Sequence, residues 1–323
     1  MLHMARMKKM LFIVNPKSGK EKMKGRLLEI VNIFSGAGYQ IQIHVTQRAQ
    51  DARDVVIREG SQKDIIVCSG GDGTLNEVIT GMLQLKHQPV LGYIPAGSTN
   101  DFASNLKLPR QLSAAAKVVV SGEDYPIDIG EFCGTESFVY VAGFGAFTEV
   151  SYLTPQDKKN LLGHQAYVLE SVKSLTSIKP YRLRVQCHDW ELEGDFIFGM
   201  VTNTISVAGF KGLVNQDVAL NDGLFEVLLI RNPKGPAELG SMVSELLLKE
   251  ENNLVLKFKT SHIRIFSAEP VDWVLDGEFG GSRTEVEIRN LRKRLTIRRP
   301  SAQMSEKQKL VRKKTRDIDK EKC

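Results

Sequence analysis

The segment Gly70-Gly71-Asp72-Gly73-Thr74 combines glycines, an acid and a hydroxyl between an apolar stretch and a helical pattern that begins near Leu75. Glycines let main-chain N–H groups approach a ligand closely, and the unpaired N–H groups of a helix N-terminus favour an anion such as phosphate. A tight turn whose glycines only supply positive φ is the alternative, but such a turn needs neither Asp72 nor Thr74. The segment therefore predicts a phosphate-binding loop.

Two further loops offer polar groups directly after predicted strands. Asn15-Pro16-Lys17-Ser18-Gly19 presents a hydroxyl and an accessible amide, although alone it is also a common turn. The loop Pro95–Ala103 contains a glycine, two hydroxyls, an amide and an acid, and helix capping by Asn100 or Asp101 would explain part of it. Neither the P-loop pattern nor the dinucleotide glycine spacing is present. The three loops together predict a nucleotide site of another kind.

Two Asp-Gly pairs lie in the second half of the chain, at Asp222-Gly223 and at Asp276-Gly277, and the second pair is followed by Glu278. Asp-Gly is typical of tight hairpin turns, so a purely structural role stays open for both pairs. A carboxylate beside a phosphate site could instead accept a proton from an alcohol or help to hold magnesium.

The first part of the chain alternates predicted strands and helices. The strands are expected at 10–14, 40–45, 64–69 and 90–94, and the helices at 25–36, 49–59, 75–85 and 112–121. This alternation predicts an α/β domain with a mostly parallel sheet. Ligands of such sheets bind beyond the carboxyl ends of the strands. Since all three loops follow strands, one common site is expected.

From about residue 128 the pattern changes to short β-rich segments, which predicts a mainly antiparallel β-sandwich. Strands are expected at 137–141, 182–187, 196–202, 224–230, 254–259 and 264–267, and helices near 165–175 and 236–249. We therefore expect an α/β domain over residues 1–127 and a β-sandwich over residues 128–290. A basic segment, residues 291–323, is expected to return to the first domain.

Composition limits the possible classes of protein. The 323 residues are 42% hydrophobic, and the longest nearly apolar stretch, Phe138–Phe147, is about half of what a bilayer span needs. The four cysteines fit no zinc spacing and suggest a reducing compartment. The net charge of +6 is concentrated near the C-terminus, where residues 301–323 carry eight lysines and arginines against four acids. That end could contact anionic lipid or nucleic acid, or be a solvated helix.

The combined motifs resemble the diacylglycerol kinase catalytic-domain family, in particular the soluble bacterial lipid kinases, over roughly residues 8–300. The motifs occur in the family's order and at similar separations: Asn15-Pro16-x-Ser18-Gly19, Gly70-Gly71-Asp72-Gly73-Thr74-x-Asn76-Glu77, Gly97-x-x-Asn100-Asp101-x-Ala103, Asp222-Gly223 and Asp276-Gly277-Glu278. Gly-Gly-Asp-Gly-Thr alone is shared with NAD kinases and has a relative in phosphofructokinases. The resemblance implies that the first domain has a fold of that kind.

The resemblance also implies roles for individual residues. The contacts to ATP would come from Asn15, Pro16, Lys17, Ser18, Gly19, Thr46, Gly70, Gly71, Asp72, Gly73, Thr74, Leu75, Asn76, Glu77 and Ser98. Asp276 matches the general base, with Glu278 as a second catalytic residue. Magnesium would bind Asp222 and the main-chain carbonyls of Ala219 and Leu224. The acids Asp72, Asp101 and Asp128 would form a water-linked network toward the metal and the base.

Two positions depart from the family pattern. Ser98 stands where many relatives have threonine, which keeps the hydroxyl, and Phe279 follows Glu278 where a proline is frequent. Neither change removes a catalytic group.

The resulting hypothesis is a kinase that transfers phosphate from ATP, with magnesium, to a lipid hydroxyl, most simply that of diacylglycerol, in phospholipid metabolism. We expect a cytoplasmic protein that contacts the anionic inner face of the membrane peripherally through Lys158, Lys159 and the basic end. No nucleic-acid partner is expected, and a homodimer is left open. Two alternatives remain, an NAD kinase and a catalytically silent nucleotide- or lipid-binding regulator.

Overall fold

The computed structural model describes residues 6–21, 23–98, 100–145, 179–188, 190–204, 206–207, 210–211, 219–248, 252–302 and 304. The predicted helix at 165–175, the predicted membrane contacts Lys158 and Lys159, and the basic end beyond residue 304 lie outside these ranges. The chain forms two compact units. Unit 1 contains residues 1–127 and 295–323, and unit 2 contains residues 128–294.

Unit 1 alternates strands and helices along the sequence. Its elements are β1 (Lys8–Val14), η1 (Ser18–Glu21), α1 (Leu27–Gly36), β2 (Tyr39–Val45), α2 (Asp51–Glu59), η2 (Gly60–Gln62), β3 (Ile65–Gly70), α3 (Asp72–Leu83), β4 (Val90–Pro95), α4 (Asp101–Asn105) and α5 (Leu112–Ser121). The strands pair in the order β4-β3-β1-β2, and every pairing is parallel. Val14 is in register with both Val45 and Ser69, so the loops after these strands begin at one edge of the sheet.

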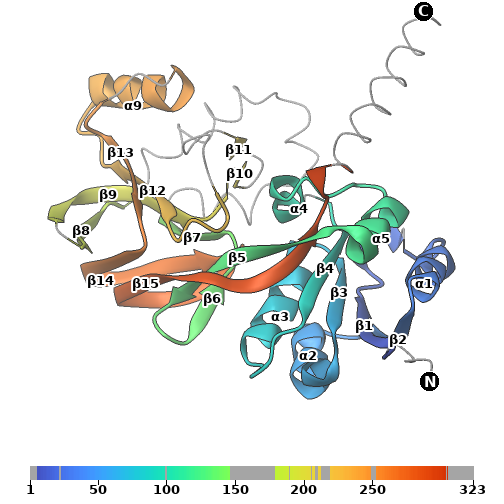
Figure 1. The fold of residues 1–323 in the computed structure, drawn as a ribbon. Coiled ribbons are helices and arrows are strands. Elements are labelled where there is room, and N and C mark those ends of the chain that lie inside the picture. The colour runs from blue at the N-terminus through green and yellow to red at the C-terminus, as the bar shows by residue number, and fades with distance from the viewer. Residues whose placement is uncertain are drawn as a thin grey trace, which may run out of the picture. The chain divides into compact units, whose positions relative to one another are not determined.

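Helices cover both faces of this sheet, with α1 and α5 on one side and α2 and α3 on the other (Figure 1). Phe12 on the first face packs edge-to-face on Phe34 of α1, with ring centroids 5.3 Å apart. Ala115 and Val119 of α5 join the same buried cluster. Successive residues of a strand point to opposite faces, which explains why Met10–Val14 of β1 and Ile65–Cys68 of β3 are continuously apolar and buried on both sides.

Unit 2 is rich in antiparallel strands. Two elements, β5 (Glu123–Phe132) and β15 (Glu278–Arg299), contain the boundary between the units. The other elements are β6 (Glu136–Phe138), β7 (Val141–Gly145), β8 (Tyr181–Cys187), β9 (Trp190–Thr202), β10 (Ser206–Val207), β11 (Phe210–Lys211), β12 (Phe225–Arg231), α9 (Pro236–Leu248), β13 (Val255–Thr260) and β14 (His262–Leu275). The expected β-rich, antiparallel second part is therefore confirmed.

The strands of unit 2 are connected differently from a sandwich of two separate sheets. The long strands β9 and β14 each pair with β8 at one end and with β7 at the other, so their hydrogen bonds form one continuous network. Only long strands can do this, and the sequence pattern predicted just 264–267 for β14. Phe144, Trp273 and Phe132 pack together at the centre of the core, where the Phe144 and Trp273 rings are 5.0 Å apart.

Two other elements differ from the predicted ones in a way that bears on the site. Helix α3 begins at Asp72 rather than near Leu75, so the glycine segment supplies its first turn. The single strand predicted at 137–141 is divided into β6 and β7. Between them, Val139 and Tyr140 turn their main-chain N–H groups toward a carboxylate.

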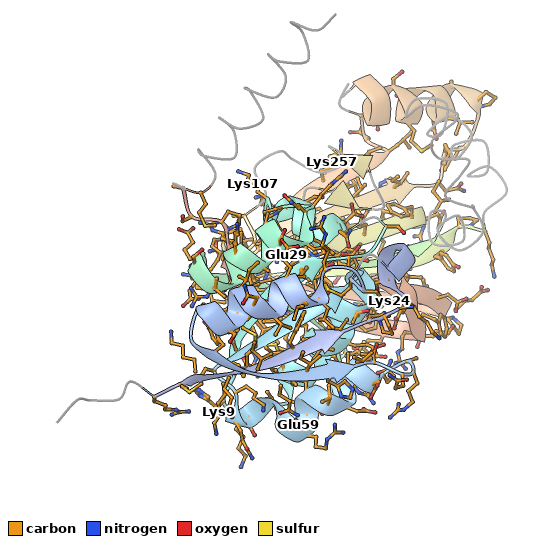
Figure 2. All side chains as sticks on the ribbon, turned by 90° about the vertical axis from the view of Figure 1, so that its right-hand side faces the viewer. Lys9, Lys24, Glu29, Glu59, Lys107 and Lys257 are labelled. Carbon is orange, nitrogen blue, oxygen red and sulfur yellow. The ribbon has the colours of Figure 1, made fainter. Side chains whose placement is uncertain are left out.

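Charged side chains lie mainly at the surface. Lys9, Glu29 and Lys107 are examples of exposed charged residues (Figure 2). No helix in the described part of the chain has the length and apolar character needed to cross a bilayer.

Candidate active site

The three polar loops of unit 1 meet where the parallel strands end. The main-chain N–H of Asn15 donates to the Ser69 carbonyl at 2.9 Å, and that of Ala96 donates to the Gly70 carbonyl at 2.8 Å. Thr46, which follows β2, donates its N–H to the Val14 carbonyl at 3.0 Å. These bonds extend the parallel ladders past the strand ends and hold the loops side by side.

Glycines allow the loops to approach this closely. Gly19 has a φ of +58°, and a Cβ there would lie 1.9 Å from the Ala96 carbonyl oxygen. A Cβ on Gly97 would lie 2.5 Å from the Gly71 Cα. A larger residue at either position would force neighbouring main chain apart, so these glycines are needed for the packing of the loops.

The glycine segment after β3 is a helix N-terminus rather than a positive-φ turn. Among the positive-φ glycines of the described chain, none belongs to 70–74, so the turn alternative is wrong. Only Gly71 separates β3 from α3, and the first N–H with a helical partner is that of Leu75, which donates to the Gly71 carbonyl at 3.1 Å. The N–H groups of Asp72, Gly73 and Thr74 therefore precede the helical ladder, as expected of an anion-binding terminus.

Side chains from the first loop and the glycine segment are joined. Asn15 donates from Nδ2 to the Thr74 hydroxyl at 2.8 Å, and its Oδ1 accepts the Lys17 N–H at 3.0 Å. Leu75 is fully buried, so only its main chain could contact a ligand. Pro16 and Ser18 are half-buried.

Asp72 binds the start of α4. Its Oδ2 accepts the Asp101 N–H at 3.2 Å, while its buried Oδ1 has no hydrogen-bond partner among the described residues. Burial raises the pKa of this carboxyl, and hydrogen bonds from the main chain at 100–102 partly oppose the rise.

The Asn100 side chain does not cap helix α4 but binds within its own loop. Asn100 stands at the N-cap of α4 with a φ of 53°, but its side chain makes no capping bond. Instead, its Oδ1 accepts the Gly97 N–H at 3.0 Å and its Nδ2 donates to the Gly97 carbonyl at 2.8 Å. The capping explanation is therefore wrong for Asn100, whose side chain closes the loop. Ser98, inside this loop, is exposed.

Glu77 holds the N-terminus of α2. Its carboxylate accepts the Gln50 N–H at 3.0 Å and the Ala52 N–H at 3.2 Å. Gln50 has a left-handed φ of 64°, which is unusual for a residue other than glycine and needs support of this kind. Next to Glu77, the buried Oδ1 of Asn76 has no hydrogen-bond partner in the described chain. The sequence-based hypothesis assigned Glu77 to ATP, whereas its carboxylate contacts the protein's own main chain.

In unit 2, Asp276 occupies a two-residue hairpin turn. Leu275 pairs with Glu278 across it, and Asp276 and Gly277 have φ values of 51° and 92°. The Asp276 carboxylate is buried and accepts three main-chain N–H groups, from Val139 at 2.7 Å and from Tyr140 and Val141 at 3.0 Å each. The hairpin and the rigidly held carboxylate coexist, so the Asp-Gly turn signal does not exclude chemistry. Glu278 is exposed.

The loop that carries Asp222 is fixed by Asp128. Asp222 accepts the Leu224 N–H at Oδ1 at 3.0 Å. The buried Asp128 accepts the Gly223 N–H at 2.7 Å and the Lys293 N–H at 2.6 Å, and its own N–H donates to the Leu220 carbonyl at 2.7 Å. Asp128 therefore determines the conformation of the main chain around Asp222.

One buried residue links this loop to the Asp276 hairpin. Asn203 donates its N–H to the Tyr140 carbonyl at 3.1 Å and its Nδ2 to the Asp128 carbonyl at 3.2 Å. Asn203 was not among the site residues predicted from the sequence. The only local signal was the polar run Thr202-Asn203-Thr204 directly after the apolar segment 196–201.

The ligand set predicted at Asp222 has the chemistry that a hard divalent cation prefers. No cluster of three or more His, Cys, Asp or Glu side chains that could hold a metal occurs in the described chain. The set that the resemblance implies, the Asp222 carboxylate and the main-chain oxygens of Ala219 and Leu224, nevertheless contains only oxygen atoms, which magnesium prefers over nitrogen or sulfur ligands.

Comparisons with known proteins show which protein family this chain is similar to. The family model for the diacylglycerol kinase catalytic domain matches residues 9–132. A diacylglycerol kinase of Bacillus subtilis (strain 168) is 36% identical over 282 residues, covering 85% of this chain and 91% of the relative. The diacylglycerol kinase of Staphylococcus saprophyticus is 33% identical over 278 residues, covering 85% and 90%.

Solved structures show the same fold. A putative diacylglycerol kinase from Bacillus anthracis str. Sterne matches with a TM-score of 0.78 at 24% identity, over 92% of this chain and 99% of that one. An NAD kinase from Archaeoglobus fulgidus in complex with ATP matches with a TM-score of 0.53 at 13% identity, over 92% and 96%. The fold is thus that shared by diacylglycerol kinases and NAD kinases.

The sequence relatives decide between these two kinds of kinase. The protein is a lipid kinase, as the motifs predicted. The chain belongs to the diacylglycerol kinase family.

Proposed function

We propose that the chain transfers the γ-phosphate of ATP to the hydroxyl of diacylglycerol and so forms phosphatidic acid and ADP. The assignment of ATP binding rests on one observation, the N-terminus of α3. The first N–H groups of this helix precede its ladder of main-chain hydrogen bonds. Gly73 supports it, because a Cβ there would meet nothing within 4 Å. The protein does not need a glycine for its own packing at that position, whereas an approaching phosphate does.

The other nucleotide contacts are proposed from the loops around that terminus. Main-chain and hydroxyl groups of Asn15–Gly19, Thr46 and Ser98 would bind the rest of the nucleotide. Asn15 and Glu77 support the site indirectly. The Asn15 side chain binds the Thr74 hydroxyl, and the Glu77 carboxylate binds the main chain at the start of α2. In this assignment the nucleotide contacts all come from unit 1.

Asp276 is proposed as the general base. As the lipid hydroxyl oxygen forms a bond to the γ-phosphorus, the bond from that phosphorus to the bridging oxygen of ADP breaks, and the hydroxyl proton passes to the Asp276 carboxylate. Three main-chain N–H groups fix the orientation of that carboxylate before the substrate arrives. The exposed Glu278 is assigned a secondary role at the same hairpin.

Magnesium would be held by the Asp222 carboxylate and the main-chain oxygens of Ala219 and Leu224. When bound, it supplies positive charge that offsets developing phosphate charge or orders water near the base. Asp128 stabilises the conformation of this loop by accepting a hydrogen bond from the Gly223 N–H. Asp72 and Asp101 are assigned to the water-linked part of the site.

We further propose that the lipid is taken from a membrane surface contacted peripherally. Phe279 is 67% exposed and follows the Asp276-Gly277-Glu278 hairpin directly. An aromatic side chain at the surface beside the proposed base is suited to the boundary between headgroups and acyl chains.

The decisive experiment offers labelled ATP and magnesium to the full chain with diacylglycerol, phosphatidylglycerol, sphingosine and NAD in parallel. We expect label in phosphatidic acid, and a loss of about 10²–10⁴-fold in rate for Asp276→Asn. Glu285→Gln is the matched control, since this exposed carboxylate lies on β15, the strand that follows the Asp276 turn, and forms a surface ion pair with Arg264. Label that enters only another lipid or NAD would refute the proposed substrate.

A further inference from the structure

An ion pair between a buried carboxylate and an exposed lysine lies beside the proposed cation loop. Glu226 on β12 is directly opposite Lys259 on β13, and Lys259 Nζ is 3.0 Å from Glu226 Oε1. Glu226 is only 3% exposed, and its Oε2 has no hydrogen-bond partner among the described residues. A carboxylate this buried requires a nearby positive charge, and Lys259 provides it.

The same ammonium group also approaches Asp222. Lys259 Nζ lies 3.8 Å from Asp222 Oδ2, beyond hydrogen-bonding distance but within ion-pair range. One cation therefore lies between two carboxylates and is closer to Glu226. The asymmetry matters, because Asp222 is the only side chain in the proposed set of magnesium ligands.

We propose that Glu226 is an internal counter-ion that holds Lys259 away from Asp222 and so keeps the Asp222 carboxylate available to a divalent cation. This inference rests on the proposed function only in assigning the cation to Asp222. Glu226 and Lys259 act as positioning residues, and neither contacts the substrate.

The charges of these side chains determine whether each substitution weakens or restores magnesium binding. With Glu226 neutral, Asp222 is still within ion-pair range of Lys259, so the lysine competes with the cation and also repels it. Opposite or like charges a few ångströms apart at a partly buried site interact strongly enough to change affinity by about tenfold or more. With both members of the pair neutral, the competitor and its counter-ion are removed together.

The test is calorimetric titration of MgCl2 into the full chain in the absence of nucleotide and lipid. Glu226→Gln should weaken magnesium binding about tenfold, and adding Lys259→Met to it should restore affinity to within about threefold of the unsubstituted protein. Lys257→Met is the matched control, because this exposed lysine lies two residues away on the same strand (Figure 2). It should change magnesium affinity less than Glu226→Gln does.

Recovery of magnesium affinity in the double variant distinguishes an electrostatic role of Glu226 from a purely structural role. If Glu226 only supported the fold, the double variant would bind magnesium as weakly as Glu226→Gln or more weakly, and the inference would be overturned. Unchanged affinity in Glu226→Gln would overturn it as well. Asp222→Asn tests the premise, since magnesium binding that survives this change would disprove the Asp222 site itself. Urea unfolding of each variant confirms that the folded protein is being titrated.

Discussion

The hydroxyl of Tyr140 donates a hydrogen bond to the main-chain oxygen of Asp276 at 2.8 Å. The main-chain N–H of Tyr140 donates to Oδ1 of the same aspartate at 3.0 Å. One residue thus holds both the turn and the carboxylate of the proposed base. Because Asp276 has a left-handed φ, this attachment from outside the hairpin stabilises a conformation that aspartate adopts infrequently.

The first prediction concerns that attachment. Tyr140→Phe keeps the ring and the N–H but removes the hydroxyl bond, which should lower the free energy of unfolding by about 1 kcal/mol. We expect kcat to fall while the KM for ATP stays nearly constant, because the change affects the orientation of the base and not the nucleotide loops. Tyr39→Phe in unit 1 is the control. A rise in the KM for ATP with unchanged kcat would contradict the assignment.

The second prediction separates folding from ligand binding at Gly73. In Gly73→Ala the new methyl group meets nothing within 4 Å and lies in a helix, so stability should rise by up to about 1 kcal/mol. ATP affinity should fall about tenfold, since the methyl group occupies space needed by the phosphates.

Gly36→Ala is the matched control for Gly73→Ala, because it is also helical with nothing within 4 Å. It should stabilise the protein to a similar extent without changing ATP affinity. Thermal unfolding and nucleotide titration measure the two effects, and unchanged ATP affinity in Gly73→Ala would argue against a phosphate at α3.

The third prediction concerns Glu77. Replacing it with alanine leaves the Gln50 and Ala52 N–H groups without their acceptor and should cost about 1–3 kcal/mol. Glu77→Gln keeps one acceptor oxygen and should cost less. Both variants should raise the KM for ATP through the displaced loop before α2. Glu29→Ala, an exposed glutamate on α1, is the control (Figure 2). Equal effects of Glu77→Ala and the control would contradict the supporting role.

The fourth prediction is a pH dependence at Asp72. Burial raises its pKa above the ordinary value of 3.8, so the native state binds this proton more tightly than the unfolded state does. The contribution to stability is therefore complete at pH values below 3.8 and is lost as the pH rises through the native pKa. The side chain in Asp72→Asn does not titrate. The free energy of unfolding of this variant should therefore rise relative to that of the parent protein as the pH rises. Urea unfolding over about pH 4–7 measures this difference, and parallel curves would refute it.

The fifth prediction tests the proposed membrane contact. Phe279→Ser should weaken binding to phosphatidylglycerol vesicles about tenfold, because the free energy of burying a phenylalanine is lost. The KM for ATP should not change. Ile57→Ser on α2 removes another exposed apolar side chain, which is 40% exposed, and should leave vesicle binding unchanged. Equal losses in both variants would mean that Phe279 has no special role.

Much of the local structure follows from short-range pattern. Helix α5 has the predicted bounds, Leu112–Ser121, and the glycine segment lies at the predicted strand-to-helix junction. Local hydrophobic spacing and glycine content decide such features. The family and the lipid kinase activity were also predicted from the order of the motifs, and the sequence relatives confirm both. The individual site residues remain predictions.

The amino-acid sequence alone thus determined which residue types follow which strand, and with them the class of enzyme. Only the tertiary structure decided what each carboxylate contacts. Glu77 binds the main chain at Gln50, Asp128 binds Gly223, and Asp276 binds Val139, a partner 137 residues away. The pairing of Glu226 with Lys259 likewise depends on the register between β12 and β13. Such contacts join segments distant in the chain, and no local propensity encodes them, because they form only when the whole chain packs.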